Sequence, residues 1–259
     1  MSGVIPNAVI KVRAMRKGWI TPAAAGLAVF VAAASSVSPS TARTPREEPV
    51  VVELFTAQGC AGCPQANAQL EAVAAEPGVI ALTYAVDYWD WQGWKDTFAK
   101  PEFSQRQRAY ARPLQQRSVS TPQLVIDGRR ELSGGPEAGL QAAIDEEAAR
   151  RGTPPEIEFR ETGDRVGVGS GRAPEGGAEV VAVVFTPGPQ TVQIRSGDNR
   201  GRSVRHMNVV RSVRSLGDWT GRPVLYALPE GLAANQSVAV MVQAKRDRRI
   251  LTAAVADRP

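Results

Sequence analysis

The chain has 259 residues, of which 43% are hydrophobic and 22% are charged, and its formal net charge is +5 at neutral pH. This length allows one large domain or two smaller ones, and the hydrophobic content is ordinary for a globular protein. The basic excess lies in the N-terminal segment and in scattered arginines, with no block of like charge interleaved with aromatic residues. We therefore expect no nucleic-acid partner.

The first 42 residues have the pattern of a signal peptide. A positive segment at 11–17 precedes an apolar stretch from Trp19 to Ala34 and a small, polar stretch from Ser35 to Ala42. This order is typical of a secretory leader, and residues 43–49 then form a linker. An uncleaved anchor helix is the alternative, and only in that case do we expect contact with a membrane. Either way the remainder is exported, so we expect a periplasmic or secreted protein, where disulfides persist.

The two cysteines of the chain, Cys60 and Cys63, lie between an apolar, β-branched run from Val50 to Phe55 and a helix-like segment that begins at Pro64. A strand that leads into C-x-x-C at the start of a helix favours a redox dithiol, because unpaired N–H groups at the helix N-terminus stabilise a thiolate. The spacing also lets Cys63 resolve a mixed disulfide formed on Cys60.

Two other interpretations of the pair stay open. The disulfide can act only as a staple of the turn, or the two sulfurs can form half of a metal site. A zinc site needs four ligands, and the single histidine, His206, is distant in the sequence. We therefore expect no metal and no cofactor.

Glu53 interrupts the apolar strand that leads to the cysteines. A carboxylate buried near a dithiol acquires a raised pKa and can accept a proton from it. The alternative is a glutamate on an exposed edge. The pattern does not decide between the two.

The next elements alternate between helix and strand. The first helix and second strand complete a β-α-β unit with parallel strands. The predicted elements are a helix from Pro64 to Ala75, a strand from Val79 to Val86, a helix from Pro101 to Gln116, strands from Leu124 to Asp127 and Arg130 to Leu132, and a helix that Gly134-Gly135-Pro136 opens and that continues to Arg151.

Aromatic residues crowd the segment from Asp87 to Lys100, where Trp89, Trp91 and Trp94 lie within six residues of one another. One interpretation is a platform beside the dithiol that grips an extended substrate, with Trp89 and Trp91 as contacts. The other is a small satellite core under a long loop. Both remain open.

Thr121-Pro122 directly precedes a predicted strand. An X-Pro bond can be cis at modest cost, and a cis proline in a fold usually has a specific role. A cis Pro122 that faces the dithiol would leave backbone groups of Thr121 free to pair with a bound peptide.

The order strand, C-x-x-C, helix, strand, helix, Thr-Pro, strand, hairpin, helix resembles the thioredoxin fold between about Val50 and Arg151. The segments VVELFTAQGCAGCPQAN, YAVDYWDWQGWKD, RQRAYA and STPQLVIDG together resemble a family of exported bacterial thioredoxin-like proteins described as a domain of unknown function. This resemblance implies the fold, export, and a redox pair at Cys60 and Cys63 with Pro122 opposite. The chain departs from thioredoxin itself, because Ala61-Gly62 replaces Gly-Pro between the cysteines.

From residue 152 onward the pattern changes to short alternating runs separated by Gly, Pro, Asp and Asn. Such runs predict an all-β, sandwich-like second domain over residues 152–259 that follows an α/β thioredoxin-like domain over residues 50–151. The predicted strands are Glu156 to Arg160, Arg165 to Val168, Ala178 to Thr186, Thr191 to Arg195, Pro223 to Leu228, Ser237 to Ala244 and Ile250 to Val255.

The segment from Gly197 to Trp219 contains five arginines and His206. The arginines can clamp an anionic group and His206 can donate a proton or bind a ligand. The simpler interpretation is a long hairpin in which Asn199 and Asn208 satisfy the turn backbone and His206 is a partly buried hydrogen-bonding residue.

The sequence therefore predicts an exported thiol–disulfide oxidoreductase whose clients are protein thiols or disulfides. In this reading Cys60 reacts with the client, Cys63 resolves the mixed disulfide, and Pro122 shapes the client groove. One alternative is an envelope binding or assembly protein whose Cys60–Cys63 disulfide is only structural. Another is a copper metallochaperone that uses both cysteines and a third ligand.

Overall fold

The computed structural model describes residues 48–133, 137–150 and 152–256, and these belong to one compact unit. The predicted signal peptide, nearly all of the predicted linker and the Gly134-Gly135-Pro136 turn lie outside the described residues. Among the described residues, no helix has the length and apolar character needed to span a membrane.

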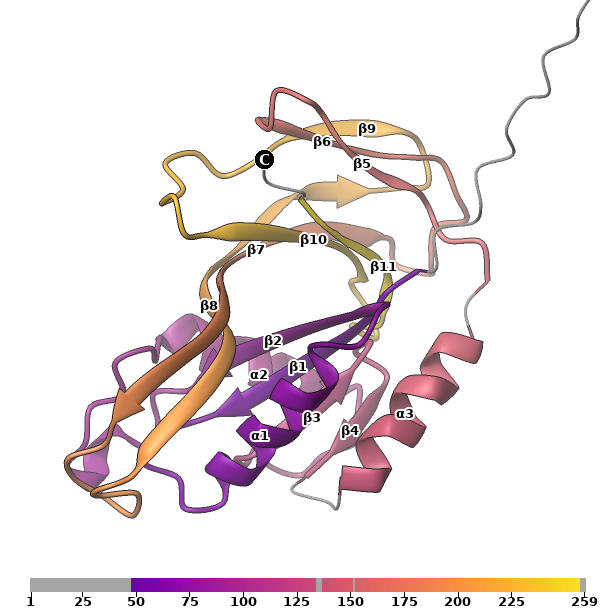
Figure 1. Ribbon diagram of the computed structural model, residues 1–259. Helices are drawn as coiled ribbons and strands as arrows, with labels where there is room; N and C mark the ends of the chain where they lie inside the picture. The colour runs from indigo at the N-terminus through magenta and orange to yellow at the C-terminus, as the bar shows by residue number, and fades with distance from the viewer. Residues whose placement is uncertain (1–47, 134–136, 151, 257–259) are drawn as a thin grey trace, which may run out of the picture. The chain divides into compact units, whose positions relative to one another are not determined.

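The first half of the described chain has a thioredoxin-like fold, as the order of elements predicted (Figure 1). Strand β1 pairs in parallel with β2, while β3 runs antiparallel to β1, and β4 antiparallel to β3. The elements are β1 (Val50–Thr56), α1 (Cys63–Val73), β2 (Val79–Ala85), the 3-10 turn η1 (Asp90–Gln92), α2 (Pro101–Ala111), β3 (Gln123–Ile126), β4 (Arg130–Leu132) and α3 (Glu137–Ala149).

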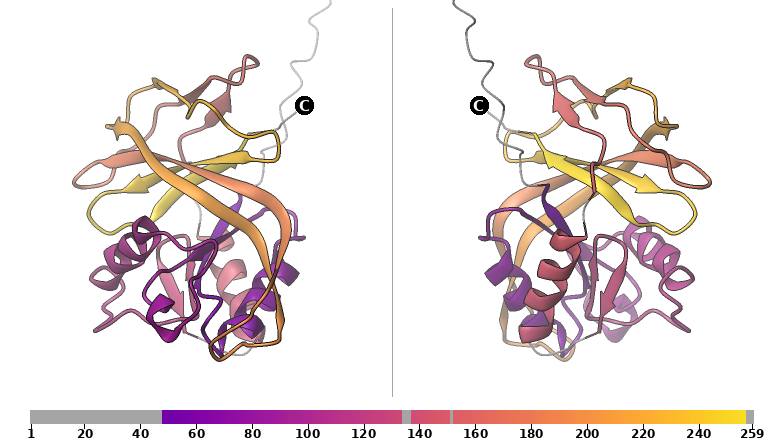
Figure 2. Two further views of the ribbon diagram at one scale, coloured as in Figure 1. Left: turned by 90° about the vertical axis from the view of Figure 1, so that its left-hand side faces the viewer. Right: turned by 90° about the vertical axis from the view of Figure 1, so that its right-hand side faces the viewer.

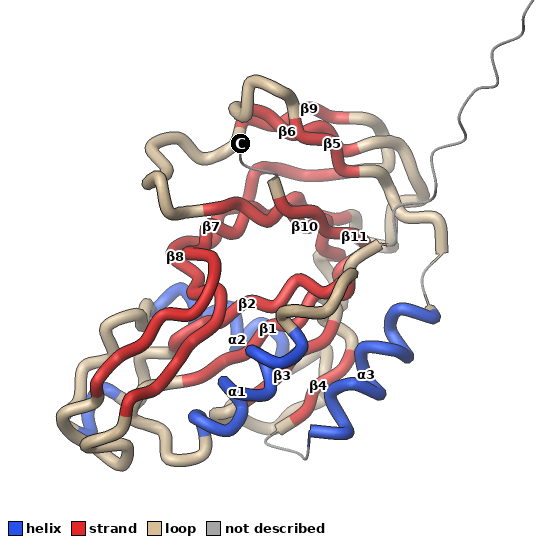
Figure 3. The backbone as a smooth tube through the Cα atoms, viewed as in Figure 1, coloured by secondary structure: helices blue, strands red, loops and turns tan. Residues whose placement is uncertain are grey.

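The second half contains only strands among its described residues, as Figure 3 shows by its lack of helix. Four of these strands extend the first sheet beyond β2, and the other three form a second sheet of order β5-β6-β9. The strands are β5 (Ile157–Phe159), β6 (Arg165–Val168), β7 (Ala178–Gln193), β8 (Ser203–Trp219), β9 (Val224–Ala227), β10 (Ser237–Ala244) and β11 (Ile250–Val255). The second sheet packs on β7 and β10 through buried side chains, which is the predicted sandwich-like arrangement.

The two halves share one eight-stranded sheet of order β11-β10-β7-β8-β2-β1-β3-β4. Strand β8 joins β2 through the parallel pair Thr83 and Val209, and the Asn208 amide donates a 2.9 Å hydrogen bond to the Ala81 carbonyl. The predicted boundary at residues 151 and 152 falls between α3 and β5.

Alternating side chains of β1 serve two different cores, because successive residues of a strand point to opposite faces. Val52 and Leu54 pack with α1 and α3. Val51 and Phe55 face α2, the two cysteines, and apolar side chains of β7, β10 and β11. The first sheet is thus buried on both faces near the dithiol, which explains the continuous apolar run that precedes it.

Strand β7 joins two predicted strands into one, and β8 is a single strand in the segment that was expected to form a hairpin by itself. Pro187-Gly188-Pro189 was expected to separate two strands, but β7 continues through it, with shifts of register against β8 before it and across it. The Asn208 side chain accepts a 2.9 Å hydrogen bond from Gly188 N, which replaces part of the interrupted ladder. The resulting long hairpin extends alongside α1 (Figures 1 and 2).

Candidate dithiol site

Cys60 and Cys63 form a disulfide with a Cα–Cα distance of 5.4 Å. Helix α1 begins at Cys63 and has Pro64 in its first turn, where the missing N–H has no helical partner to lose. The Cys63 amide donates a 3.1 Å hydrogen bond to the Cys60 carbonyl, which closes the turn. Cys60 is 2% exposed and Cys63 is 0% exposed, so both are buried in this oxidised state.

The Thr121–Pro122 peptide bond is cis, as the sequence suggested. Pro122 Cδ lies 3.5 Å from the position that a β-carbon on Gly62 would occupy, so the proline packs against the turn between the cysteines. Trp89 Nε1 donates a 2.7 Å hydrogen bond to Thr121 Oγ1. The Trp89 β-carbon lies 3.9 Å from the position that a β-carbon on Gly59 would occupy, so Trp89 also packs against the residue before Cys60. These contacts bring the predicted client-binding residues Thr121, Pro122 and Trp89 together beside the dithiol.

The tryptophan loop, residues 87–100, holds both partly buried and exposed tryptophans, and its predicted role as a substrate platform stays a prediction. Trp89 is partly buried against the core that contains the cysteines. Trp94 is half-buried and donates a 2.8 Å hydrogen bond to Gln58 Oε1. Trp91, in η1, is 81% exposed, so its indole is free to contact another molecule.

Asp96 is a buried carboxylate of this loop that no sequence pattern distinguished. Its Oδ2 accepts a 2.7 Å hydrogen bond from Gln58 N, and its Oδ1 accepts one of 2.9 Å from Phe98 N. Burial raises the pKa of Asp96 to about 6, although these hydrogen bonds favour the charged form. Asp96 therefore holds the backbone at Gln58, two residues before Cys60.

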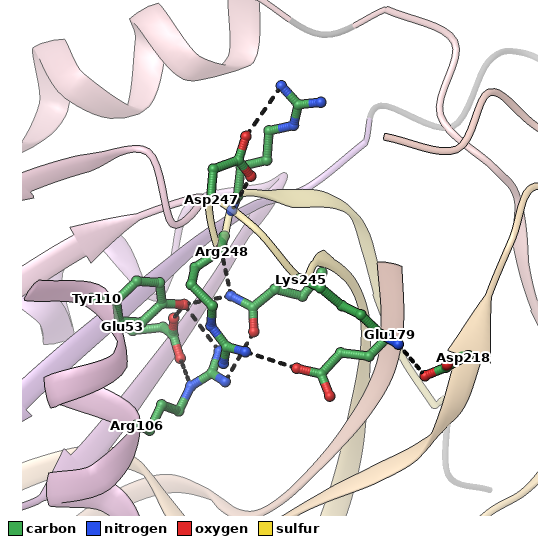
Figure 4. Close-up of polar contacts among 10 residues, drawn as sticks. Glu53, Arg106, Tyr110, Glu179, Asp218, Lys245, Asp247 and Arg248 are labelled. Atoms are coloured by element: carbon green, nitrogen blue, oxygen red, sulfur yellow. Dashed lines mark hydrogen bonds and ion pairs between the residues drawn. The ribbon is translucent and has the colours of Figure 1, made fainter. Parts of the chain in front are cut away.

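Glu53 is fully buried, so the alternative of an exposed edge glutamate is wrong. Arg106 Nε donates a 2.6 Å hydrogen bond to Glu53 Oε1, and the Tyr110 hydroxyl donates to Glu53 Oε2. Arg106 is buried, and α2 turns its side chain inward toward this carboxylate (Figure 4). Both oxygens of Glu53 therefore have hydrogen-bond partners.

The network continues from Glu53 into the second half of the chain (Figure 4). Gln243 of β10 accepts a 3.1 Å hydrogen bond from Arg106 Nη1 and donates one of 2.8 Å to the Tyr110 hydroxyl. Gln243 also donates to the carbonyl of Arg248, whose guanidinium pairs with Glu179 at 2.8 Å. This network links β1 and α2 to β10 through polar contacts inside an apolar core.

His206 is fully buried, and neither ring nitrogen has a hydrogen-bond partner among the described residues. The expectation of a partly buried hydrogen-bonding histidine is therefore wrong. Strand β8 turns the ring onto Phe98, with ring centroids 5.5 Å apart and the planes nearly perpendicular. Burial lowers the pKa of His206 to about 4, because the apolar surroundings disfavour the charged ring.

The sequence predicted that the Asn199 side chain satisfies the backbone of its own turn. Instead, its amide contacts the turn that carries the disulfide. Its amide donates hydrogen bonds of 2.9 Å to the Gln58 carbonyl and 2.7 Å to the Cys60 carbonyl. Asn208, the other predicted turn asparagine, bonds to β2 and to Gly188 instead. The second half of the chain thus contributes directly to the surroundings of the cysteines.

Residues 51–243 match the family described as "Protein of unknown function (DUF1223)". The chain belongs to this family. The crystal structure of protein AGR_C_4864 from Agrobacterium tumefaciens is 31% identical, covers 80% of this chain and 92% of its own, and has a TM-score of 0.66. HBP35 of Porphyromonas gingivalis is 15% identical, covers 81% of this chain and 75% of its own, and has a TM-score of 0.56, which is a likeness of fold. No curated protein matches the chain.

In this DUF1223 protein, sequence reasoning located the cysteines, Pro122 and the tryptophan loop, because each has a local signature. It missed Asp96, Arg106 and Asn199 as parts of the site's surroundings. The sequence shows each of them only as a polar residue, Asp96 in a loop, Arg106 in a helix and Asn199 in a turn. Their importance depends on partners far away in the chain.

Proposed function

We propose that the protein is an exported thiol–disulfide oxidoreductase that exchanges electrons with protein clients through Cys60 and Cys63. The observation that carries this proposal is the disulfide at the start of α1 with cis Pro122 packed against its turn. A helix N-terminus stabilises a thiolate on the cysteine that precedes it, and the thiolate is the reactive form. The predicted export to the periplasm or beyond fits this chemistry.

The exchange proceeds in two balanced steps when the protein reduces a client. The Cys60 thiolate attacks one client sulfur, the client disulfide breaks, and the second client sulfur leaves as a thiolate that takes a proton. Cys63 then loses its proton and attacks Cys60 Sγ, which releases the first client sulfur and forms the Cys60–Cys63 disulfide. Two electrons pass to the client, and the reverse sequence oxidises a client dithiol.

Cys60 is the sulfur that we assign to the client. Cys63 is the first residue of α1 and is completely buried, whereas Cys60 lies before the helix and retains slight exposure. The predicted role of Glu53 as a proton acceptor stays a prediction. Arg106 and Tyr110 use two of the lone-pair positions of its carboxylate, and others remain.

The client site that we propose is the surface around Thr121, Pro122 and the tryptophan loop. Backbone groups next to a cis proline can pair with an extended client segment, and the exposed Trp91, two residues from Trp89, offers a large apolar contact. Together these groups favour an unfolded or extended protein segment as the client.

The reduction potential of the Cys60–Cys63 pair tests the proposal. We expect equilibration against glutathione and dithiothreitol buffers to give a value between roughly −270 and −120 mV, the span of known exchange proteins. A Cys63→Ser variant should trap clients as mixed disulfides in an envelope extract, and a Cys60→Ser variant should trap none. A potential below about −300 mV, or equal trapping by both variants, would exclude the proposal.

The second candidate function is an envelope binding or assembly protein in which the disulfide only braces the turn. The near-complete burial of both cysteines favours this alternative. Its signature would be a disulfide that strong reductant cleaves only when the protein unfolds.

A further inference from the structure

The turn between β7 and β8, residues 194–202, is called the hairpin tip below. Asn199 lies in it, fully buried, and its Nδ2 donates to the carbonyls of Gln58 and Cys60 at 2.9 and 2.7 Å. Arg202 Nη1 donates a 3.1 Å hydrogen bond to Asn199 Oδ1 and so orients the amide. Both amide hydrogens of one side chain are thus used on the turn that carries the disulfide.

The backbone of the hairpin tip also packs against this turn. A β-carbon built on Gly197 would lie 4.0 Å from Gly59 Cα and 3.8 Å from Trp94 Cβ. Gly197 has a φ of +74°, a conformation that glycine adopts without strain. On the other side of the dithiol turn, Pro122 packs against Gly62. The disulfide turn is therefore held between the hairpin tip and the cis-proline loop.

This arrangement limits the reaction of the disulfide with external thiols. Thiol–disulfide exchange requires a thiolate to reach one of the two sulfurs, and its rate depends on access. Both cysteines are almost completely buried, so the surroundings must open before an external thiol can reach Cys60. Of the segments that hold the turn, the hairpin tip is the one tied to Cys60 itself by a side-chain hydrogen bond.

We propose that Asn199 is a latch that holds the hairpin tip on the dithiol turn and that its release controls access of thiols to Cys60. Asn199 acts as a positioning residue, because its side chain contacts the backbone of the turn and takes no part in the sulfur chemistry. The latch would favour clients that can enter a narrow opening, such as extended segments, over rigid protein surfaces. Only this statement about clients rests on the proposed function.

The reaction used for the test is reduction of the disulfide by dithiothreitol. One thiolate of the reagent attacks Cys60 Sγ, the Cys60–Cys63 bond breaks, and Cys63 leaves as a thiolate that takes a proton. The second reagent thiolate then attacks the reagent sulfur of the mixed disulfide. The reagent is oxidised to its cyclic disulfide, and the protein holds two reduced cysteines.

The first variant is Asn199→Ala, which removes the latch. The second is Arg202→Ala, which removes only the guanidinium that orients the Asn199 amide; Arg202 itself is exposed. The matched control is Gln193→Ala on the same hairpin. Its amide is exposed and bonds to the Gly201 carbonyl within the hairpin, not to the dithiol turn. Reduction of the folded, full-length protein is followed by alkylating the thiols that appear and measuring the mass shift.

We expect reduction of Asn199→Ala to be at least about tenfold faster than that of the Gln193→Ala control, because local opening no longer breaks the latch bonds. Arg202→Ala should show a smaller acceleration. The wild-type rate should level off at high dithiothreitol concentration, where opening becomes limiting. The equilibrium constant with the reagent should stay unchanged, since a latch alters the rates in both directions.

If Asn199→Ala and Arg202→Ala are reduced at the same rate as the control, the latch proposal is wrong. If Asn199→Ala fails to fold, the reduction rate of Arg202→Ala still tests the proposal. A changed equilibrium constant with an unchanged rate of reduction would also overturn it. A different result would refute the proposed function. A disulfide that stays oxidised against reducing glutathione mixtures would refute exchange with clients, while faster reduction of Asn199→Ala would still support the latch.

Discussion

Glu53 and Arg106 form an ion pair inside the protein, with 2.6 Å between Glu53 Oε1 and Arg106 Nε and both side chains almost completely buried. The pair joins β1 to α2, and the guanidinium also donates hydrogen bonds to Gln243 of β10 and to the Tyr110 hydroxyl. The ring faces of Tyr84 and Tyr110 lie 5.6 and 5.5 Å from the guanidinium carbon. A buried charge whose partner is removed has no solvent to compensate it, so each member of this pair depends on the other.

Replacing Arg106 by methionine should therefore destabilise the protein by about 3–5 kcal/mol, because it leaves the Glu53 carboxylate buried without its partner. The matched control is Arg108→Met on the exposed side of the same helix, which should change stability by less than about 0.5 kcal/mol. Urea unfolding measures both variants. In the double variant Glu53→Met with Arg106→Met, much of the lost stability should return. Equal stability of the two single variants would contradict the assignment of a buried ion pair.

The free energy of unfolding should depend on pH through His206. Its folded pKa of about 4 lies below the ordinary value of 6.5, so the unfolded chain binds the proton more tightly. The stability that depends on a neutral His206 is fully present above pH 6.5. It is lost as the pH falls toward 4, by an amount on the order of 3 kcal/mol. His206→Phe keeps an aromatic ring against Phe98 and should remove this loss. An unchanged pH dependence in His206→Phe would exclude a buried neutral histidine.

Asp96 should act in the opposite direction over nearly the same range. Its folded pKa of about 6 lies above the ordinary value of 3.8, so the folded protein binds the proton more tightly. The stability that this contributes is complete below pH 3.8 and is lost as the pH rises toward 6. Asp96→Asn should therefore make the decline of stability on acidification from pH 6 to 4 steeper. Asp198→Asn, at an exposed position of the hairpin tip, is the control and should leave the slope as it is.

Trp91 should matter for clients and not for folding. With 81% of its surface exposed, Trp91→Ala should change the free energy of unfolding by less than about 0.5 kcal/mol. The rate of exchange with an extended, disulfide-bonded peptide should fall, while the rate with dithiothreitol should not. Leu225→Ala, at the other large exposed hydrophobic residue among those described, is the control and should alter neither rate. Equal peptide rates for the two variants would remove Trp91 from the client surface.

Much of the fold followed from local patterns. The bounds of β6, β10 and β11 agree with the predicted strands, because alternating apolar residues and flanking turn residues define each of them locally. The length of β7 did not follow, because Pro187-Gly188-Pro189 has the composition of a turn, and only a partner strand allows the strand to continue through it. Here β8 does so, and the Asn208 side chain supplies a hydrogen bond at the irregularity.

The sequence by itself determined that two cysteines stand between a buried strand and a helix and that Thr121-Pro122 precedes a later strand, since these are relationships between neighbours in the chain. Only the tertiary structure decided that the disulfide is buried, that Arg106 neutralises Glu53 and that Asn199 holds the turn of Cys60. Glu53 and Arg106 are 53 residues apart, and Asn199 and Cys60 are 139 apart. Such contacts depend on how β8 and α2 pack, and no local preference of their own residues specifies that packing.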